Sequence, residues 1–250
     1  MASTIVLITG ANGGVGFATA KVIASTSEAF HVIMAGRSLE KVRKATSELE
    51  HAGVKGSISA VQLDVTDDKS IERAVKAVQD QHERLDVLVN NAGVGAMDPD
   101  VKTRFHLCLE TNVLGPALVA AAFRPLLLNS HKPYSIYVSS EVGSLALASE
   151  PDPPHWPALP NEEAYRASKA ALNMVAVMEK KHFGPKGLNV FAMNPGLVVS
   201  NLRGTNDEAR SGGGNAGDPS ESGQLVLSII QGERDADAGR LVSRDGVLPW

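Results

Sequence analysis

The sequence contains a single cysteine, Cys108, among its 250 residues. An internal disulfide is therefore impossible, and a metal cluster held by cysteines is disfavoured. The seven histidines are scattered and none has a partner at the spacing of a metal-ligand pair, so we expect no metal site. A chain of this length buries enough surface to fold without such cross-links. The lack of disulfides fits the reducing cytosol.

Long basic runs and long apolar runs are also missing. No run of lysine or arginine exceeds two residues, and the formal net charge is −4. This balance disfavours nucleic acid or an anionic membrane surface as the main partner. No apolar stretch reaches the roughly 18–20 residues of a membrane span. With 43% hydrophobic and 21% charged residues, the composition excludes a disordered chain, a collagen-like fibre and a coiled-coil rod. We expect a cytoplasmic globular protein.

Short β-branched runs alternate with longer helical patterns almost to the end of the chain. The runs are apolar on both faces, as in a parallel sheet that is covered by helices. The predicted strands are Thr4–Thr9, His31–Ala35, Ser57–Gln62, Leu85–Asn90, Ser135–Ser139, Asn189–Asn194 and Gly239–Ser243, and the predicted helices are Gly14–Ser27, Ser38–His51, Asp67–Gln81, Thr103–Leu128 and Glu162–His182. This order predicts an α/β, doubly wound Rossmann fold, with a parallel sheet of about seven strands, in one domain over residues 1–250.

Two segments interrupt the alternation. The proline-rich run Glu150–Pro157 cannot form a regular helix or a central strand, and Gly204–Gly217 contains three consecutive glycines. A helix restarts at Asp218, the expected N-cap. Long insertions are often lids or binding loops, although they can also be solvent-exposed padding. We expect residues 142–160 and 197–217 to roof a substrate pocket.

A glycine-rich turn follows the first predicted strand and opens a helix, in the segment Thr9-Gly10-Ala11-Asn12-Gly13-Gly14-Val15-Gly16. Glycines in this context allow a tight turn and let backbone N–H groups approach a pyrophosphate at the helix N-terminus. After the second strand stand Arg37 and Ser38, where a site for NAD usually offers an acid. A guanidinium and a hydroxyl suit a 2′-phosphate, so the sequence favours NADP(H) over NAD; alternatively, Arg37 lies unused on the surface.

Tyr165 and Lys169 are four residues apart within a helical pattern and therefore share one face. An unperturbed tyrosine has a pKa of about 10, which makes it a poor base at neutral pH. A nearby ammonium favours the phenolate form. Taken alone, such a pair occurs often by chance.

These segments belong to a larger set of motifs. In chain order they are Thr9-Gly10-x-x-x-Gly14-x-Gly16, Asp64-Val65, Asn90-Asn91-Ala92-Gly93, Asn112, Ser139-Ser140, Tyr165-x-x-x-Lys169 and Pro195-Gly196. This set of motifs extends over essentially the whole chain. Through these motifs the sequence resembles the short-chain dehydrogenase/reductase family, in its single-domain, carbonyl-reductase-like branch.

The resemblance implies a role for each matching residue. Tyr165 would be the acid/base, Lys169 would hold the nicotinamide ribose and lower the tyrosine pKa, and Ser140 would polarise the substrate oxygen. Asn112 would keep a water in the proton relay, and Leu197 with Val198 would line the nicotinamide side. The residues expected to contact the cofactor are Gly10, Asn12, Gly13, Gly14, Val15, Gly16, Arg37, Ser38, Asp64, Val65, Asn91, Ala92, Gly93, Tyr165, Lys169, Pro195, Gly196 and Val198.

Simpler interpretations remain for several positions. Ser139 could be the catalytic hydroxyl in place of Ser140, which we favour because family members use the second serine. Asn112 could only bond to backbone, and Asn90 and Asn91 could be structural, which we favour for Asn90. The sequence also departs from the family pattern, because the insert before Tyr165 is long. Related insertions can abolish tetramers, so a monomer or a homo-oligomer is expected, with a dimer favoured over a tetramer.

A second departure concerns the cofactor. Position 13 is glycine where some NADP-preferring members have a basic residue, so the NADP prediction depends mainly on Arg37.

The leading hypothesis is an NADPH-dependent oxidoreductase, a carbonyl reductase or ketoreductase that reduces a ketone or aldehyde to the alcohol. Five apolar side chains suggest a pocket wall suited to an apolar or aromatic carbonyl substrate. They are Leu145, Leu147, Trp156, Leu197 and Leu202. The alternatives are an isomerase, epimerase or lyase with no net redox change, and a non-enzymatic NADP-sensing protein, because fold alone does not separate these functions.

Overall fold

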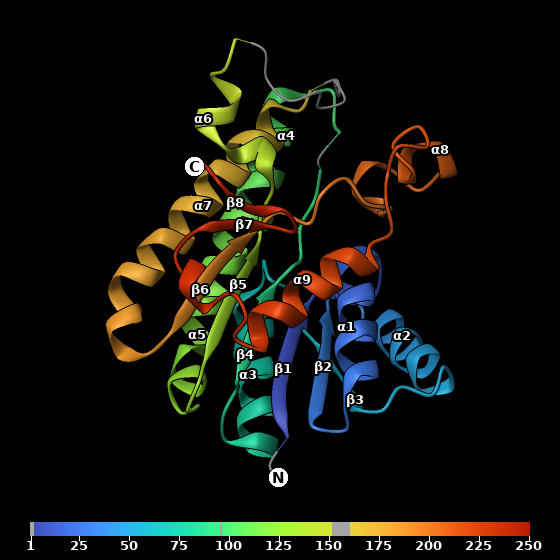
Figure 1. The fold of residues 1–250 in the computed structure, drawn as a ribbon. Helices are drawn as coiled ribbons and strands as arrows, with labels where there is room; N and C mark the ends of the chain where they lie inside the picture. Colours follow the sequence, from blue (N-terminus) through green and yellow to red (C-terminus); the bar gives the residue numbers. More distant parts are fainter. Residues whose placement is uncertain (1–2, 96, 152–160) are drawn as a thin grey trace.

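An eight-stranded sheet runs through the middle of the structure, in the order β3-β2-β1-β4-β5-β6-β7-β8 (Figure 1). The computed structural model describes residues 3–95, 97–151 and 161–250. Strands β1 to β7 are parallel, and β8 is antiparallel to β7. The strands are β1 (Thr4–Thr9), β2 (Phe30–Gly36), β3 (Ser57–Gln62), β4 (Val87–Asn90), β5 (Tyr134–Val138), β6 (Asn189–Met193), β7 (Leu241–Ser243) and β8 (Gly246–Leu248).

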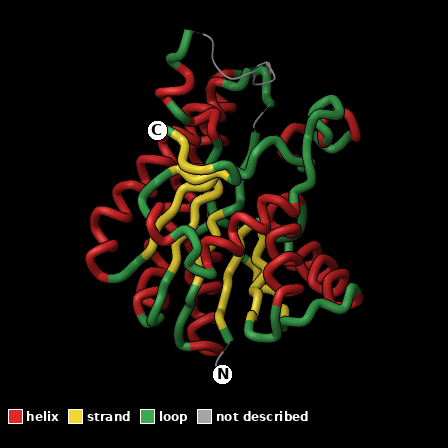
Figure 2. The backbone as a smooth tube through the Cα atoms, viewed as in Figure 1, coloured by secondary structure: helices red, strands yellow, loops and turns green. Residues whose placement is uncertain are grey.

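Helices cover both faces of this sheet (Figure 2). The α-helices are α1 (Gly14–Thr26), α2 (Leu39–His51), α3 (Asp68–His82), α4 (Val101–Leu109), α5 (Gly115–Leu128), α6 (Leu145–Ala148), α7 (Glu163–Phe183), α8 (Asp207–Arg210) and α9 (Ser220–Ile230). The shorter turns are the π-helical η1 (Glu110–Leu114) and the 3₁₀ segments η2 (Glu141–Gly143), η3 (Gly184–Lys186), η4 (Asn201–Arg203) and η5 (Asp235–Asp237). The arrangement is the doubly wound α/β fold that the sequence predicts.

The alternation of side chains along β1 explains the two layers of core. Ile5 and Leu7 pack on the face covered by α3, α5 and α7, whereas Val6 and Ile8 pack on the face covered by α1, α2 and α9. All four side chains are buried. A strand covered on both faces must be apolar at every position, which is why these runs show no polar alternation. Each fully buried side chain of this size contributes about 1.5–3 kcal/mol to stability.

The strand order reverses between β1 and β4, and this reversal locates the functional edge. The chain first builds outward from β1 to β3, then crosses back to β4 and continues to β7 (Figure 1). Ligands of open α/β sheets bind outside the carboxyl ends of the strands at such a switch point. A ligand site is therefore expected among the segments that follow β1, β2, β4, β5 and β6.

Helix α9 has Pro219 as its N-cap, where Asp218 was predicted. Two larger features also differ from the sequence prediction. The predicted helix Thr103–Leu128 is interrupted, because α4 and α5 are joined through the π-helical turn η1. The sheet has eight strands where about seven were predicted, because the short β8 folds back on β7 after Arg244 and Asp245. Both features are short, and neither leaves a periodic pattern in the sequence.

The helical run Val101–Leu128 is long and apolar enough to cross a membrane by length and composition. The sequence analysis found no such stretch, so this finding is a correction. In the structure, however, the α5 side chains Val119, Phe123 and Leu127 are fully buried in the core. A core helix meets the same criterion, and the run is therefore weak evidence for a membrane span.

Candidate functional site

The first segment at the carboxyl edge is the glycine-rich turn between β1 and α1. Gly10 and Gly14 have φ angles of +64° and +54°, a backbone region in which other residues are strained. Helix α1 begins after Gly13, and among the described residues it has no side-chain cap and no acid in its first turn. Its first N–H groups are therefore available to an anion. The turn fits the pyrophosphate of a dinucleotide.

Asn91 holds this turn from the end of β4. Its Nδ2 donates to Thr9 O at 2.8 Å and to Gly10 O at 3.3 Å. Its backbone N–H donates to the Thr9 hydroxyl at 2.9 Å. A Cβ atom on Gly16 would lie 2.5 Å from Asn91 Nδ2 and 2.8 Å from Gly10 O. Gly16 is thus needed for close packing, and Asn91 supports the turn.

This packing predicts a difference between two glycine-to-alanine variants. Gly16→Ala should lower the melting temperature of the cofactor-free protein by about 2–10 °C, since overpacking costs about 1–3 kcal/mol. That cost exceeds the gain in helix propensity, which is about 1 kcal/mol. Gly13→Ala is the matched control, because Gly13 is extended and a Cβ there would meet nothing within 4 Å. Thermal unfolding measures both, and equal melting temperatures would contradict the packing argument.

Arg37 and Ser38 follow β2 at the same edge. Arg37 is exposed, and its guanidinium has no hydrogen bond or ion pair within the described part of the chain. Its carbonyl accepts a hydrogen bond from Gln62 Nε2 at 3.1 Å, which fixes the backbone. The Ser38 hydroxyl accepts from Lys41 N at 3.4 Å and caps α2. The guanidinium of Arg37 therefore lies at the end of β2 with no counter-charge among the described residues.

The segment after β3 is ordered by its own side chains. Asp64 Oδ1 accepts hydrogen bonds from Thr66 N at 3.0 Å and from Thr66 Oγ1 at 2.8 Å. Val65 is buried, and a Cβ on Gly115 would lie 2.9 Å from it. The two side chains thus shape the local turn, and contact with a cofactor stays a prediction for Asp64 and Val65.

Helix α7 carries Tyr165 and Lys169 one turn apart on its inner side. Lys169 is only 5% exposed, and its Nζ donates to Val138 O at 2.8 Å, at the end of β5. The same Nζ lies 5.5 Å from the centroid of the half-buried Tyr165 ring. A neighbouring strand end therefore fixes the ammonium beside the tyrosine, as the spacing predicts.

Burial controls the protonation of this pair. It lowers the pKa of Lys169 from 10.5 to about 8. It also raises the pKa of Tyr165 above its usual value, with a smaller rise from Cys108 and an opposing effect of Arg203. The sequence analysis expected Lys169 to lower the tyrosine pKa, whereas the net direction in this structure is upward. The phenol therefore keeps its proton at neutral pH.

The two serines after β5 have different surroundings. Ser139 is 1% exposed, and its hydroxyl donates to Asn173 Oδ1 and, at 3.4 Å, to Lys169 O. Ser140 is half-buried, and its hydroxyl accepts from Val142 N at 3.4 Å at the start of η2. A Cβ on Gly143 in η2 would lie 2.7 Å from Lys169, so this segment packs directly on α7. Ser140 is therefore the serine whose side chain is only partly enclosed.

Asn112 lies in the π-helical turn and is buried. Its Oδ1 accepts from Val94 N at 2.8 Å, and its Nδ2 donates to Val94 O at 2.9 Å and to Ser168 Oγ at 3.0 Å. Its side chain thus holds the segment after β4 against α7. The interpretation that Asn112 bonds mainly to backbone agrees with these contacts. The buried Asn90 side chain has no hydrogen-bond partner among the described residues.

Two further residues at this edge were not singled out from the sequence. Asn194 Oδ1 accepts from Glu141 N at 3.2 Å and from Gly196 N at 3.3 Å, and so it links the loops that follow β5 and β6. Its position as a polar residue at the end of a buried parallel strand was the available signal. Arg203 lies in η4 and acts electrostatically on Tyr165. Its place inside a long loop left no such signal.

The expected roof is only partly described. In the first segment Leu145 is 72% exposed, and Trp156 lies outside the described residues together with positions 152–160. In the second segment, Val198 and Gly217 form a β-bridge that closes the loop at its base. A side chain on Gly95 would collide with the Leu202 carbonyl, so this loop packs against the segment after β4.

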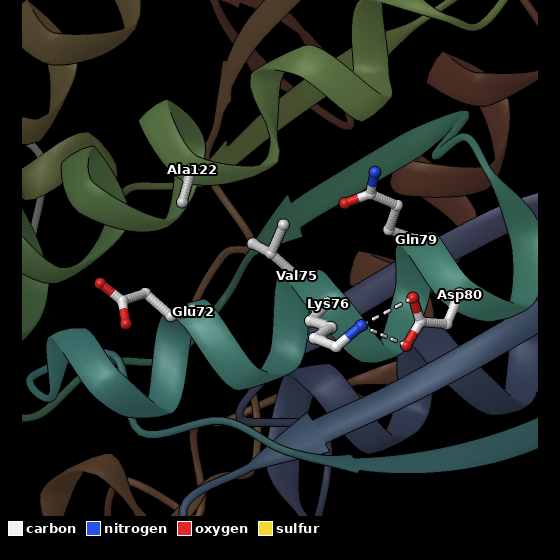
Figure 3. Close-up of a pocket in the computed structure, with 6 residues that line it drawn as sticks. All are labelled: Glu72, Val75, Lys76, Gln79, Asp80 and Ala122. Carbon is white, nitrogen blue, oxygen red and sulfur yellow. Dashed lines mark hydrogen bonds and ion pairs between the residues drawn. The ribbon is translucent and has the colours of Figure 1, made fainter.

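A hollow on the outer surface lies apart from these residues. It has a volume of about 370 Å³ and opens between α3 and α5 (Figure 3). Its lining includes an ion pair at 2.9 Å between Lys76 and Asp80. It contains none of the candidate catalytic or cofactor residues, and we assign it no role.

Comparison with known proteins gives the family. Residues 4–211 match the family model described as short chain dehydrogenase. The short-chain dehydrogenase/reductase tropE of Talaromyces stipitatus is 33% identical over 254 aligned residues, which cover 96% of this chain and 95% of tropE.

Solved structures show the same fold. The NADPH-bound carbonyl reductase from chicken fatty liver superposes with a TM-score of 0.82 at 26% identity, over 100% of both chains. A metagenomic short-chain oxidoreductase in complex with NADP has a TM-score of 0.69 at 25% identity and covers 92% of this chain and 91% of its own. The chain therefore belongs to the short-chain dehydrogenase/reductase family, whose members are oxidoreductases that use a nicotinamide cofactor on small-molecule substrates.

Proposed function

We propose that the protein is an NADPH-dependent reductase of ketones or aldehydes. The observation that carries this proposal is the position of the half-buried Tyr165 ring beside the Lys169 ammonium, which is fixed to the end of β5. A carbonyl reduction requires a proton donor at the substrate oxygen, and a tyrosine hydroxyl, which carries its proton at neutral pH, can act as that donor. A cofactor sensor would have no need for an acid/base, whereas an isomerase, epimerase or lyase could also use one and is separated from a reductase by the measurement of NADPH consumption.

Each residue has a definite part in this mechanism. A bound nicotinamide supplies the hydride. Tyr165 donates its proton to the carbonyl oxygen while that oxygen gains negative charge, and Ser140 stabilises the same oxygen with a hydrogen bond. Lys169 binds the ribose hydroxyls with its ammonium. Asn112 keeps the segment after β4 in place, and its part in a proton relay stays a prediction.

The choice of NADP(H) is supported by Arg37. Its guanidinium is exposed and, among the described residues, free of a carboxylate, so it can bind the 2′-phosphate through charge-assisted hydrogen bonds. The uncapped start of α1 suits the pyrophosphate. The chicken reductase and the metagenomic oxidoreductase also hold NADPH and NADP, respectively.

The direct test is NADPH consumption, followed by nicotinamide absorbance, with a broad panel of ketones and aldehydes and with NADH in parallel. Consumption that depends on a carbonyl substrate supports the proposal. If the cofactor binds but no carbonyl consumes it, the proposal is wrong. Product formed without a net change in NADPH would favour an isomerase, epimerase or lyase.

Arg37→Glu should reverse the cofactor preference. The loss of a charge-assisted contact, about 1.5–3 kcal/mol, lowers kcat/KM for NADPH by about 10- to 100-fold, while NADH is affected little. Lys44→Glu on the outer face of α2 makes the same charge change at an exposed position and is the matched control. An equal loss for both cofactors in Arg37→Glu would contradict the assigned contact.

A further inference from the structure

A buried arginine, Arg104, reaches from α4 to the start of the helix that carries Tyr165. Its side chain is only 2% exposed. Its Nη1 donates to Asp98 O and to Pro99 O, both at 2.8 Å, and its Nη2 donates to Glu163 Oε1 at 2.5 Å. A buried ion pair adds little stability over apolar side chains of similar volume, because each charge loses its water. The pair does, however, fix α4, the segment after β4 and the first turn of α7 relative to one another.

The first turn of α7 has few bonds of its own. The helix begins at Glu163, and Tyr165 lies in this turn. The first helical hydrogen bond runs from Arg166 N to Glu162 O at 2.9 Å, so the Tyr165 N–H has no partner within the helix. Among the described residues, no side chain caps this end. Helix ends fray unless groups outside the helix hold them, and the bond between Arg104 and Glu163 is such a contact.

Lys169, one turn further along α7, has a separate anchor. Its Nζ donates to Val138 O of β5 at 2.8 Å. Arg104 instead holds the turn before it and lies in α4, which packs against α7 (Figure 1). Loss of Arg104 should therefore release the turn that contains Tyr165 and leave the Lys169 ammonium in place.

We infer that Arg104 is a positioning residue, which through Glu163 holds the Tyr165 hydroxyl at the carbonyl that is reduced. The inference rests on the proposed reductase function, in which Tyr165 donates the proton. Arg104 acts through the backbone of α7, because its own side chain is enclosed. A displacement of about 1 Å at a reacting group can lower a rate by about 100-fold, so a contact of this kind affects turnover strongly.

Arg104→Met tests this inference on the full chain with NADPH and the best carbonyl substrate of the panel. Methionine fills much of the same volume, and the Glu163 side chain that loses its partner is 52% exposed to water, so the fold should be kept. We expect kcat to fall by about 10- to 100-fold. The dissociation constant for NADPH should stay within about three-fold of wild type, because Lys169 keeps its anchor. Lys102→Met, at an exposed position of α4, is the matched control and should leave both values unchanged.

Variants of both partners distinguish positioning from a purely structural role. Arg104→Lys should retain part of kcat, since an ammonium can still pair with Glu163. Glu163→Ala removes the same link from the other side and should lower kcat by a similar factor. The double variant Arg104→Met with Glu163→Ala should lose no more than the larger single loss, as expected for two residues that form one link. A lower melting temperature with unchanged kcat in the single variants would overturn the inference, and so would losses that multiply in the double variant.

Fluorine NMR of the cofactor-free protein labelled with 3-fluorotyrosine follows Tyr165 without turnover. The chain has three tyrosines, and Tyr165→Phe assigns the resonance of interest. In Arg104→Met we expect this resonance to shift or broaden, while those of Tyr134 and Tyr137 in β5 stay unchanged. An unchanged Tyr165 resonance overturns the inference. A changed resonance in a protein that consumes no NADPH supports the positioning link and refutes the reductase proposal alone.

Discussion

Tyr165→Phe is expected to reduce kcat for carbonyl reduction by about 10²- to 10⁴-fold, the contribution typical of a positioned general acid. The substitution removes one hydroxyl and keeps the ring, so the packing around this part of α7 changes little. Burial raises the pKa of Tyr165, so this hydroxyl carries its proton in the working pH range, as the proposed role of proton donor requires. The measurement is steady-state NADPH consumption with the best substrate of the panel.

Cofactor binding gives the internal check on this prediction. The dissociation constant for NADPH should change by no more than about ten-fold in Tyr165→Phe, since one neutral hydrogen bond contributes about 0.5–1.5 kcal/mol. Tyr134→Phe is the matched control, because the Tyr134 hydroxyl bonds to Asp235 at 2.9 Å from the amino end of β5, away from the site. That variant should keep its turnover. More than one-tenth of wild-type turnover in Tyr165→Phe would refute the assigned role.

Lys169→Met should remove both turnover and much of the cofactor affinity, unlike Tyr165→Phe. Methionine fills a similar volume but cannot donate to Val138 O or to ribose hydroxyls. We expect kcat/KM to fall by about 10²-fold or more, with NADPH binding weakened by about 10-fold, because a charge-assisted contact is lost. Lys181→Met, at an exposed position of the same helix, should behave like the wild type. Unchanged NADPH affinity in Lys169→Met would contradict the contact with the ribose.

The stability of the cofactor-free protein should also depend on pH through Lys169. Its pKa is about 8 in the folded protein and 10.5 as the ordinary value. Between these values the unfolded chain binds a proton that the folded chain does not, so the free energy of unfolding rises with pH in this window. From pH 8 to 9.5 the gain is about 2 kcal/mol, at about 1.4 kcal/mol per pKa unit.

The comparison with Lys169→Met isolates this contribution. Buried Cys108 and Tyr165 have raised pKa values and act in the opposite direction at alkaline pH, but they are present in both proteins. The melting temperature of wild type minus that of Lys169→Met should therefore rise by several degrees between pH 7 and 9.5. A difference that stays constant would show that Lys169 is not perturbed by burial.

The sequence was a good guide to the elements that are governed by local patterns. Thr4–Thr9 and Ser57–Gln62 were predicted with the bounds that the structure has, and most helices agree within one or two residues. A strand that is buried on both faces must be apolar throughout, and a helix that covers a sheet must be apolar on one side, so both leave a readable pattern. The motifs identified the family for a similar reason. The glycine-rich turn requires positive φ at Gly10 and Gly14, and glycine adopts this conformation without strain, so the turn can be recognised in the sequence.

The two secondary-structure features that the sequence did not predict have different causes. The π-helical turn around Asn112 exists together with bonds to Val94 and Ser168, which belong to other elements. The eighth strand is three residues long and pairs only with β7. The π-helical turn has no periodicity of its own, because its partners are remote in sequence. Strand β8 is too short to show a periodic pattern, although its partner β7 lies just before it in the chain.

The sequence by itself determined the doubly wound order of strands and helices, the family, and the identity of the side chains at the carboxyl edge. The tertiary structure decided what surrounds them. It buries Lys169 and half-buries Tyr165, it reverses the expected direction of the tyrosine pKa, and it distinguishes Ser140 from the enclosed Ser139. Hydrogen-bonding patterns and periodicity are local and can be read along the chain, whereas burial and electrostatics depend on every group that packs around a residue.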